Sequence, residues 1–150
     1  MNIGPQPEFT VGCFTIVIKN GKVLLVQRED NGLWAIPGGG LMYGEWPQHA
    51  AIREVYEETG YRVKIKKLTG IYVKKKANNI VLAFRGIITG GRTRLTDETL
   101  AVAFFPLHKL PKNLIPTHRK RIEDAISPDG PAIRMQKTFP YFSKLTKRKK

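Results

Sequence analysis

Cysteine, acidic residues and long apolar runs are scarce in this chain of 150 residues. Cys13 is the only cysteine, so no disulfide can form within the chain. This suits a reducing compartment, and we expect a cytoplasmic protein. The longest apolar run, 11–18, is too short to cross a bilayer and is interrupted by Gly12 and Thr15. The N-terminus has no charged segment followed by an apolar one, so we expect neither a signal peptide nor membrane binding.

The shortage of acids leaves the chain strongly basic. Twenty-six Lys and Arg against twelve Asp and Glu give a formal net charge of +14. Such a surface attracts polyanions and anionic substrates, so the charge is compatible with an RNA partner. A solvated basic surface that only aids solubility is the alternative. The tail, 143–150, is basic, and Phe139, Tyr141 and Phe142 before it are expected to pack rather than to bind RNA.

The few acids are concentrated in one segment. Four of the twelve lie close together, at Glu45, Glu54, Glu57 and Glu58. An anionic pocket in a cationic protein suits a metal site that serves a phosphate substrate.

The apolar pattern predicts strands before and after a central helix. After a loose lead-in, 1–9, strands are expected at Thr10–Lys19, Lys22–Arg28, 34–36, 41–43, 63–73, 80–88 and 100–105. Helices are expected at Pro47–Thr59 and 117–126, a hairpin turn at Asn20-Gly21, a flexible loop at Gly38–Gly40 and a turn at Gly90-Gly91. The stretch 134–150 has no clear period. This order predicts a single α/β or α+β domain over 1–150 with a mixed sheet.

The central helix would carry three glutamates on one face. At about 100° per residue, Glu57 and Glu58 fall within about 60° of Glu54. The packing face would hold Ile52, Val55, Tyr56 and Thr59.

Glutamates on neighbouring turns repel one another by roughly 0.2–0.5 kcal/mol per pair. Bound Mg²⁺ or Mn²⁺ relieves this repulsion, since hard cations prefer carboxylate oxygens. Ala50 and Ala51 beside the glutamates would leave room for an ion or ligand. The alternative is a merely solvated acidic face. His49 stands alone, as expected for a surface residue, and no zinc-ligand spacing occurs.

The spacing of these residues resembles the signature of the Nudix hydrolase family. That signature reads Gly, five residues, Glu, seven residues, Arg-Glu, an aliphatic residue, any residue, Glu-Glu, any residue, Gly and an aliphatic residue. The fixed residues correspond to Gly39, Glu45, Arg53, Glu54, Glu57, Glu58 and Gly60. Tyr61 departs from the aliphatic position, where it can still pack. The lead-in 34–39 and, more weakly, 97–99, 104–106 and 110–111 also look like the family.

The resemblance implies an α/β/α sandwich and a hydrolase in which water attacks a diphosphate linkage of a nucleoside diphosphate joined to another group. It implies Mg²⁺ or Mn²⁺ held by Glu57 and Glu58, with Glu54 as a ligand or as the base that orients water. Glu45 would support the metal site or fix the loop, and Arg53 would orient a glutamate.

Each of the remaining candidate residues has more than one possible role. The family resemblance implies that Glu98 is a metal ligand or a base. The alternative is that Glu98 is an exposed acidic residue of a turn. Gly38–Gly40 would bring the backbone close to the site, and Arg28 would bind a substrate phosphate or lie on the surface. Two other functions stay open: an enzyme acting on RNA 5′ ends, and a non-catalytic nucleotide-binding module. The intact glutamate set argues against the latter.

Overall fold

The computed structural model describes Gly4 and residues 7–138. The basic tail, 143–150, and Phe139, Tyr141 and Phe142 lie outside the described residues. Neither described helix has the length and apolar character needed to cross a membrane.

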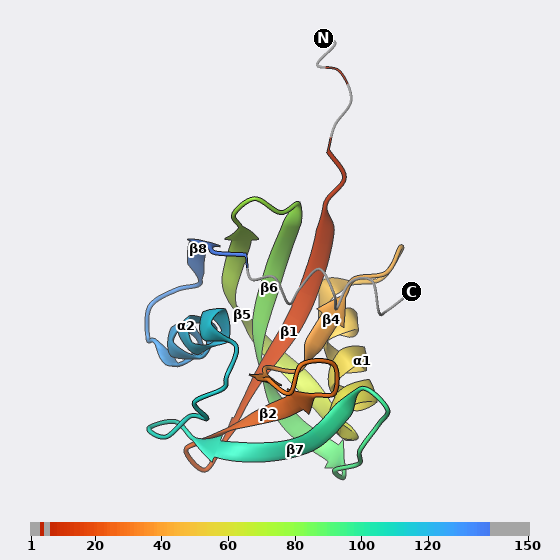
Figure 1. Ribbon diagram of the computed structural model, residues 1–150, viewed down its shortest axis with the longest axis vertical. Coiled ribbons are helices and arrows are strands. Elements are labelled where there is room, and N and C mark those ends of the chain that lie inside the picture. Colours follow the sequence, from red (N-terminus) through yellow and green to blue (C-terminus); the bar gives the residue numbers. More distant parts are fainter. Residues whose placement is uncertain (1–3, 5–6, 139–150) are drawn as a thin grey trace.

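A mixed sheet with a helix on either side forms the described part of the chain. Its elements are β1 (Thr10–Lys19), β2 (Lys22–Arg28), β3 (Trp34–Ala35), β4 (Gly38–Gly40), α1 (Pro47–Thr59), β5 (Tyr61–Lys74), β6 (Asn79–Gly91), β7 (Thr99–Pro106), α2 (Pro116–Ile126) and β8 (Ala132–Gln136). The strands run in the order β3-β2-β1-β6-β5-β8, while β4 pairs with β1 and β7 with β2. β1 is parallel to β6 and β5 to β8, whereas the other pairs are antiparallel. Figure 1 shows α1 and α2 on opposite sides of the sheet, which confirms the predicted α/β/α sandwich.

The first strand is covered on both faces, as its apolar sequence predicted. Ile16 packs with Ile122 of α2 in one cluster. Val17, on the other face, packs with Val55 of α1. Because successive side chains of a strand point to opposite faces, β1 supplies both layers of the core.

The alanines of α1 lie in the core. Ala50 and Ala51 are fully buried against Cys13 and Phe84. Their small side chains let the helix approach the sheet, so the expectation that they leave room for an ion is wrong. The expectation that Tyr56 belongs to the packing face is also wrong, because its side chain is exposed and its ring contacts the guanidinium groups of Arg62 and Arg94 at 4.7 and 4.8 Å.

Several expected loops and strands differ from the structure. Gly38–Gly40 is not a flexible loop but a strand, antiparallel to β1. The segment 41–43 is not a strand, since the chain turns at Tyr43. Gly90 and Gly91 do not form a separate turn but end β6, paired with β5. The strand β8 was missed because its middle residues, 133–135, are exposed and show no apolar alternation.

The limits of α1 and the hairpin turn match the prediction, and α2 begins one residue earlier than expected. Asn20 and Gly21 both have positive φ, of 53° and 73°, as a type I′ hairpin turn requires. Pro47 occupies the first turn of α1, and Gly60 ends the helix with φ of 86°. Tyr61 packs edge-on against Phe104, which confirms that it can pack in place of an aliphatic residue.

We expect Gly60→Ala to destabilise the protein more than Gly21→Ala. Both positions have positive φ, which costs an L-residue about 1–2 kcal/mol. A methyl group at Gly60 would also lie 2.2 Å from the carbonyl oxygen of Arg92, whereas one at Gly21 would meet nothing within 4 Å. Urea denaturation of both variants measures the difference, and equal losses of unfolding free energy would contradict the close packing at Gly60.

Candidate active site

Arg53 gathers three of the predicted glutamates around its guanidinium group. Its Nε lies 2.8 Å from Oε2 of Glu45, and its Nη1 lies 3.0 Å from Glu54 and 2.9 Å from Glu57. Its Nη2 also donates to the carbonyl oxygen of Gly40. The bond to Glu45, followed by the charges of the other acids, raises the pKa of Arg53, so the group stays charged. Arg53 therefore orients glutamates, as expected.

Glu45 fixes the loop that precedes α1. Its Oε1 accepts hydrogen bonds from the backbone N–H of Met42 and from Arg53, both at 3.1 Å. The hydrogen bond from Arg53 is the main cause that holds the pKa of Glu45 below its ordinary value. Of the two roles expected for this residue, fixing the loop is visible in these contacts.

The other glutamates differ in exposure. Glu54 and Glu58 are buried, with 4% and 2% of their surface exposed, whereas Glu57 is exposed. Oε1 of Glu58 accepts a hydrogen bond of 3.2 Å from the backbone N–H of Gly38. Glu54 and Glu58 are one helical turn apart, so both face β4, and Glu57 lies at the solvent side. His49 is exposed, as predicted.

The strand β4 brings backbone without side chains against the acidic helix. A methyl group added at Gly39 would lie 2.4 Å from the carboxyl carbon of Glu54. One added at Gly38 would lie 2.3 Å from the ring of Phe14, on the opposite side of the strand. The two glycines therefore allow contact on both faces of β4 at once, and the backbone of β4 lies close to Glu54 and Glu58.

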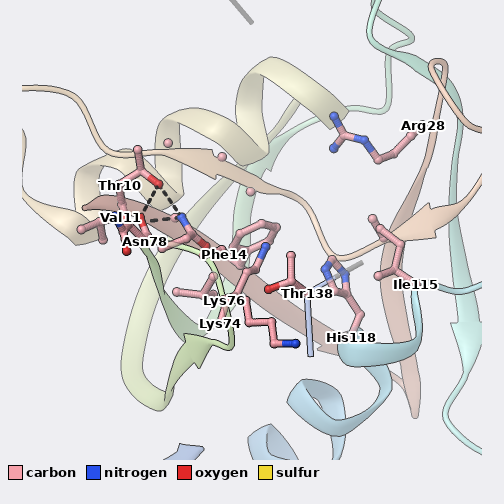
Figure 2. A pocket seen from close by; sticks show the side chains of 18 residues that line it. Thr10, Val11, Phe14, Arg28, Lys74, Lys76, Asn78, Ile115, His118 and Thr138 are labelled. Carbon is pink, nitrogen blue, oxygen red and sulfur yellow. Dashed lines mark hydrogen bonds between the residues drawn. The ribbon is translucent and has the colours of Figure 1, made fainter. Parts of the chain in front are cut away.

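A cavity of about 510 Å³ lies against the same strand (Figure 2). Arg28 and Gly38–Gly40, the four residues predicted to bind substrate, all line it. The side chain of Arg28 is 14% exposed, with its Nε 3.4 Å from Asp30, and its role in binding a phosphate stays a prediction. In Figure 2, Phe14 lies between Thr10 and Asn78 at one end and Arg28, Ile115 and His118 at the other.

Sequence reasoning missed most of the cavity lining. Phe14, Lys74, Lys76, Asn78, Ile115 and His118 line it and were not singled out. Lys74 and Lys76 belong to a segment that was expected only to connect two strands. Its positive charges were the one feature of the sequence that could have indicated a role in binding an anion. Among the described lining residues there is no Asp or Glu, so the side-chain charge of the cavity is positive.

Glu98 lies in the turn that precedes β7, half-buried. Its backbone N–H donates to the Thr96 hydroxyl, and its own carbonyl accepts from the N–H of Glu29. The next residue, Thr99, donates from its hydroxyl to the carbonyl oxygen of Glu58 at 3.5 Å. The start of β7 is therefore held beside the end of α1, while the role of the Glu98 carboxylate stays a prediction.

The glutamates supply oxygen donors of the type that Mg²⁺ and Mn²⁺ prefer. In their present arrangement, the described residues contain no group of three or more His, Cys, Asp or Glu that could hold a metal ion. Arg53 accounts for this, because it occupies the space between the carboxylates of Glu45, Glu54 and Glu57. Glu57 is exposed and can turn away from Arg53, so the donor set fits a metal once that ion pair opens.

Comparison with known proteins agrees with this arrangement. Residues 7–125 match the NUDIX domain family. A putative 8-oxo-dGTP diphosphatase of Bacillus subtilis (strain 168) is 36% identical over 118 residues, covering 77% of this chain and 79% of the relative. An ADP-ribose pyrophosphatase of Methanocaldococcus jannaschii is 36% identical over 116 residues, covering 73% of this chain and 68% of the relative.

A solved structure shows the same fold. The crystal structure of a NUDIX hydrolase from Nitrosomonas europaea matches with a TM-score of 0.77 at 22% identity, over 89% of this chain and 82% of the other. Family match, sequence relatives and fold thus agree with the signature read from Gly39 to Gly60. The chain belongs to the NUDIX domain family and is a hydrolase that acts on phosphoric anhydrides.

Proposed function

We propose that this protein is a metal-dependent pyrophosphohydrolase that cleaves the diphosphate linkage of a nucleoside diphosphate joined to a further group. One observation carries the proposal: the glycine strand β4 contacts the buried Glu54 and Glu58 and also lines a cavity with cationic side chains. A diphosphate lying along β4 would therefore meet the carboxylate site without intervening side chains. The names of the two relatives, which refer to 8-oxo-dGTP and ADP-ribose, support a nucleotide substrate.

The residues of α1 would have different roles in the reaction. Glu54, Glu57 and Glu58 would hold Mg²⁺ or Mn²⁺, which supplies charge neutralisation and an acidified water when bound. Arg53 keeps Glu54 oriented, and Glu54 serves as a ligand or as the base that orients the water. Phosphoryl transfer depends mainly on such positioning and charge stabilisation.

The cavity would position the rest of the substrate. Arg28 offers a guanidinium to a phosphate oxygen. Phe14 and Ile115 supply apolar surface against which a base can pack. The cationic lining attracts the anionic substrate before it binds.

We expect Mg²⁺ or Mn²⁺ to raise the melting temperature, because a ligand that binds only the folded state stabilises it. At about 100 times Kd the gain is about 2.7 kcal/mol. EDTA should abolish activity. Glu57→Gln should reduce the metal-induced shift, whereas Glu123→Gln, an exposed helical glutamate on α2, should keep it. Full activity in a rigorously metal-free preparation would contradict metal dependence.

A substrate panel tests the proposed reaction directly. It contains 8-oxo-dGTP, ADP-ribose, other nucleoside diphosphate derivatives and an RNA with a 5′ triphosphate, each with Mg²⁺ and with Mn²⁺. Phosphate and pyrophosphate release are scored. Hydrolysis of a nucleoside diphosphate derivative supports the proposal, hydrolysis of the RNA alone would replace it with the RNA 5′-end alternative, and no hydrolysis of any member would reject it.

A further inference from the structure

A groove on the flank of α1 away from the glutamates takes no part in the proposed reaction. It has a volume of about 500 Å³ and lies between α1 and β5. None of the residues that line it also lines the cavity against β4. Because a helix turns about 100° per residue, Tyr56 shares a flank with the groove residues Gln48 and Ile52 and lies about 160° around the helix from Glu54. A ligand in this groove is therefore distinct from a diphosphate bound along β4.

Lysines of β5 make the groove cationic. Lys64, Lys66 and Lys67 line it and are exposed, and none of its described lining residues is an Asp or Glu. The pairing of β5 with β6 passes from Ile65 directly to Lys67, so Lys66 is the extra residue of a β-bulge. Successive residues of a regular strand point to opposite faces, and the bulge explains why two consecutive lysines are both exposed here. The strand thus presents three positive charges at the groove.

Two exposed arginines extend the positive charge along β5 toward the end of α1. The guanidinium of Arg62, which precedes Lys64 on β5, lies 4.7 Å from the ring centroid of the exposed Tyr56. Arg94 contacts the same ring at 4.8 Å, and its backbone N–H donates to the carbonyl oxygen of Thr59 at 2.9 Å. Within the described part of the chain, neither arginine forms an ion pair with an acid. Their charge is therefore available to an external anion.

The sequence around the groove supplies no acid to balance these charges. Between Glu58 and Asp97 the chain has ten Lys and Arg and no Asp or Glu. Glu57, the exposed glutamate of α1, lies on the other flank of the helix and is paired with Arg53. A surface with charge of one sign attracts polyanions over a distance of about 8–10 Å at ordinary ionic strength. The cationic surface consists of Arg62, Lys64, Lys66, Lys67 and Arg94.

We propose that the cationic surface binds single-stranded RNA. Its lysines contact phosphates, and the guanidinium planes beside Tyr56 stack on unpaired bases. Gln48 and His49 line the groove and are exposed, so their side chains can form hydrogen bonds with the ribose 2′-hydroxyl, which DNA lacks. A membrane fits the groove less well, because the apolar side chains that line it are buried or half-buried and cannot insert into lipid. The proposal is independent of the proposed reaction, since it uses none of the residues assigned to that reaction.

Binding of an RNA without a phosphoric anhydride tests the surface. The probe is an unstructured fluorescent RNA oligonucleotide with a 5′ hydroxyl, and polarisation is measured without divalent metal over a series of salt concentrations. The groove variant, Lys66→Gln/Lys67→Gln, removes two charges. The matched control, Lys109→Gln/Lys112→Gln, also removes two charges from exposed lysines. These lie in the segment leading to the bridge between Leu114 and β3, which is far from β5 in the strand order.

The groove variant should bind RNA about tenfold more weakly. Its slope of log affinity against log salt should fall by about 1.4, since each phosphate contact of a single strand contributes about 0.7. The control should keep the affinity and slope of the wild type, and both variants should keep turnover of the best substrate of the panel. No RNA binding by the wild type, unchanged affinity in the groove variant, or equal losses in both variants would overturn the proposal. Lys64→Gln/Lys67→Gln provides a second groove variant, with the same outcomes, if the first does not fold.

Arg62→Lys separates RNA binding from a general attraction of polyanions, because lysine keeps the charge but lacks the planar group that stacks. RNA affinity should fall about fivefold or more in this variant. The salt slope should stay unchanged, and so should binding of inorganic polyphosphate, which has no bases. Equal losses for RNA and polyphosphate would overturn RNA as the occupant, and so would binding of DNA of the same sequence as tightly as RNA. Binding of anionic lipid vesicles that the groove variant loses, without binding of RNA, would replace RNA by a membrane.

Discussion

Glu57→Gln and Glu58→Gln should each lower turnover by about 10²–10³-fold while the protein stays folded. Each substitution removes a carboxylate charge but keeps the side-chain volume, and metal-assisted charge stabilisation is worth several kcal/mol of activation free energy. Glu57 is exposed, and when Glu57 is replaced Arg53 still pairs with Glu45 and Glu54. In Glu58→Gln, the amide oxygen can still accept the N–H of Gly38. Melting temperatures without metal should therefore stay close to that of the wild type.

The measurement is steady-state turnover with Mg²⁺ on the best substrate of the panel. Glu123→Gln is the matched control, because Glu123 is also an exposed helical glutamate and pairs only loosely with Lys120, at 3.6 Å. It should keep wild-type turnover. Unchanged activity in both Glu57→Gln and Glu58→Gln would reject the assignment of these glutamates to the metal site.

Gly39→Ala should lower turnover by about 10–100-fold, the usual effect of disturbing the groups that orient metal ligands. Its methyl group would lie 2.4 Å from the carboxyl carbon of Glu54 and 2.5 Å from each carboxylate oxygen. Glu54 is buried and is held by Arg53 at 3.0 Å, so its carboxylate must leave its present position. The forced shift of a packed side chain should also reduce stability, by about 1–3 kcal/mol.

The neighbouring glycine is the control for this substitution. A methyl group at Gly40 would meet nothing within 4 Å, and neither Gly39 nor Gly40 has a positive φ. Gly40→Ala should therefore keep both turnover and melting temperature near the wild-type values. Unfolding by urea and turnover at saturating substrate measure the two effects. Full activity in Gly39→Ala would show that the contact between β4 and Glu54 is not needed for turnover.

The sequence by itself determined the features that depend on short stretches of chain. The limits of α1 follow from Pro47 and Gly60, and the hairpin follows from Asn20 and Gly21, because each depends on local backbone preference. Helix spacing placed the three glutamates of α1 on one face. The reaction class was implied by the resemblance of the residues from Gly39 to Gly60 to the family signature. The shared contact of Arg53 with its neighbouring glutamates also follows from that spacing.

The tertiary structure decided which distant residues meet. Gly38–Gly40 reads as a flexible loop because glycine has no side chain to show a period, and only pairing with β1 makes it a strand. The exposed residues of β8 show no alternation either, yet β8 holds Gln136 beside Lys74.

The cavity depends on this long-range pairing more than any other feature. Phe14, Lys74 and His118 come from β1, β5 and α2, and no local pattern relates them. The sequence alone thus determined the family and the acidic helix, because both depend on residues within one helix and its flanks. The shape and charge of the cavity proposed to receive the substrate were decided by the packing of the sheet between its two helices.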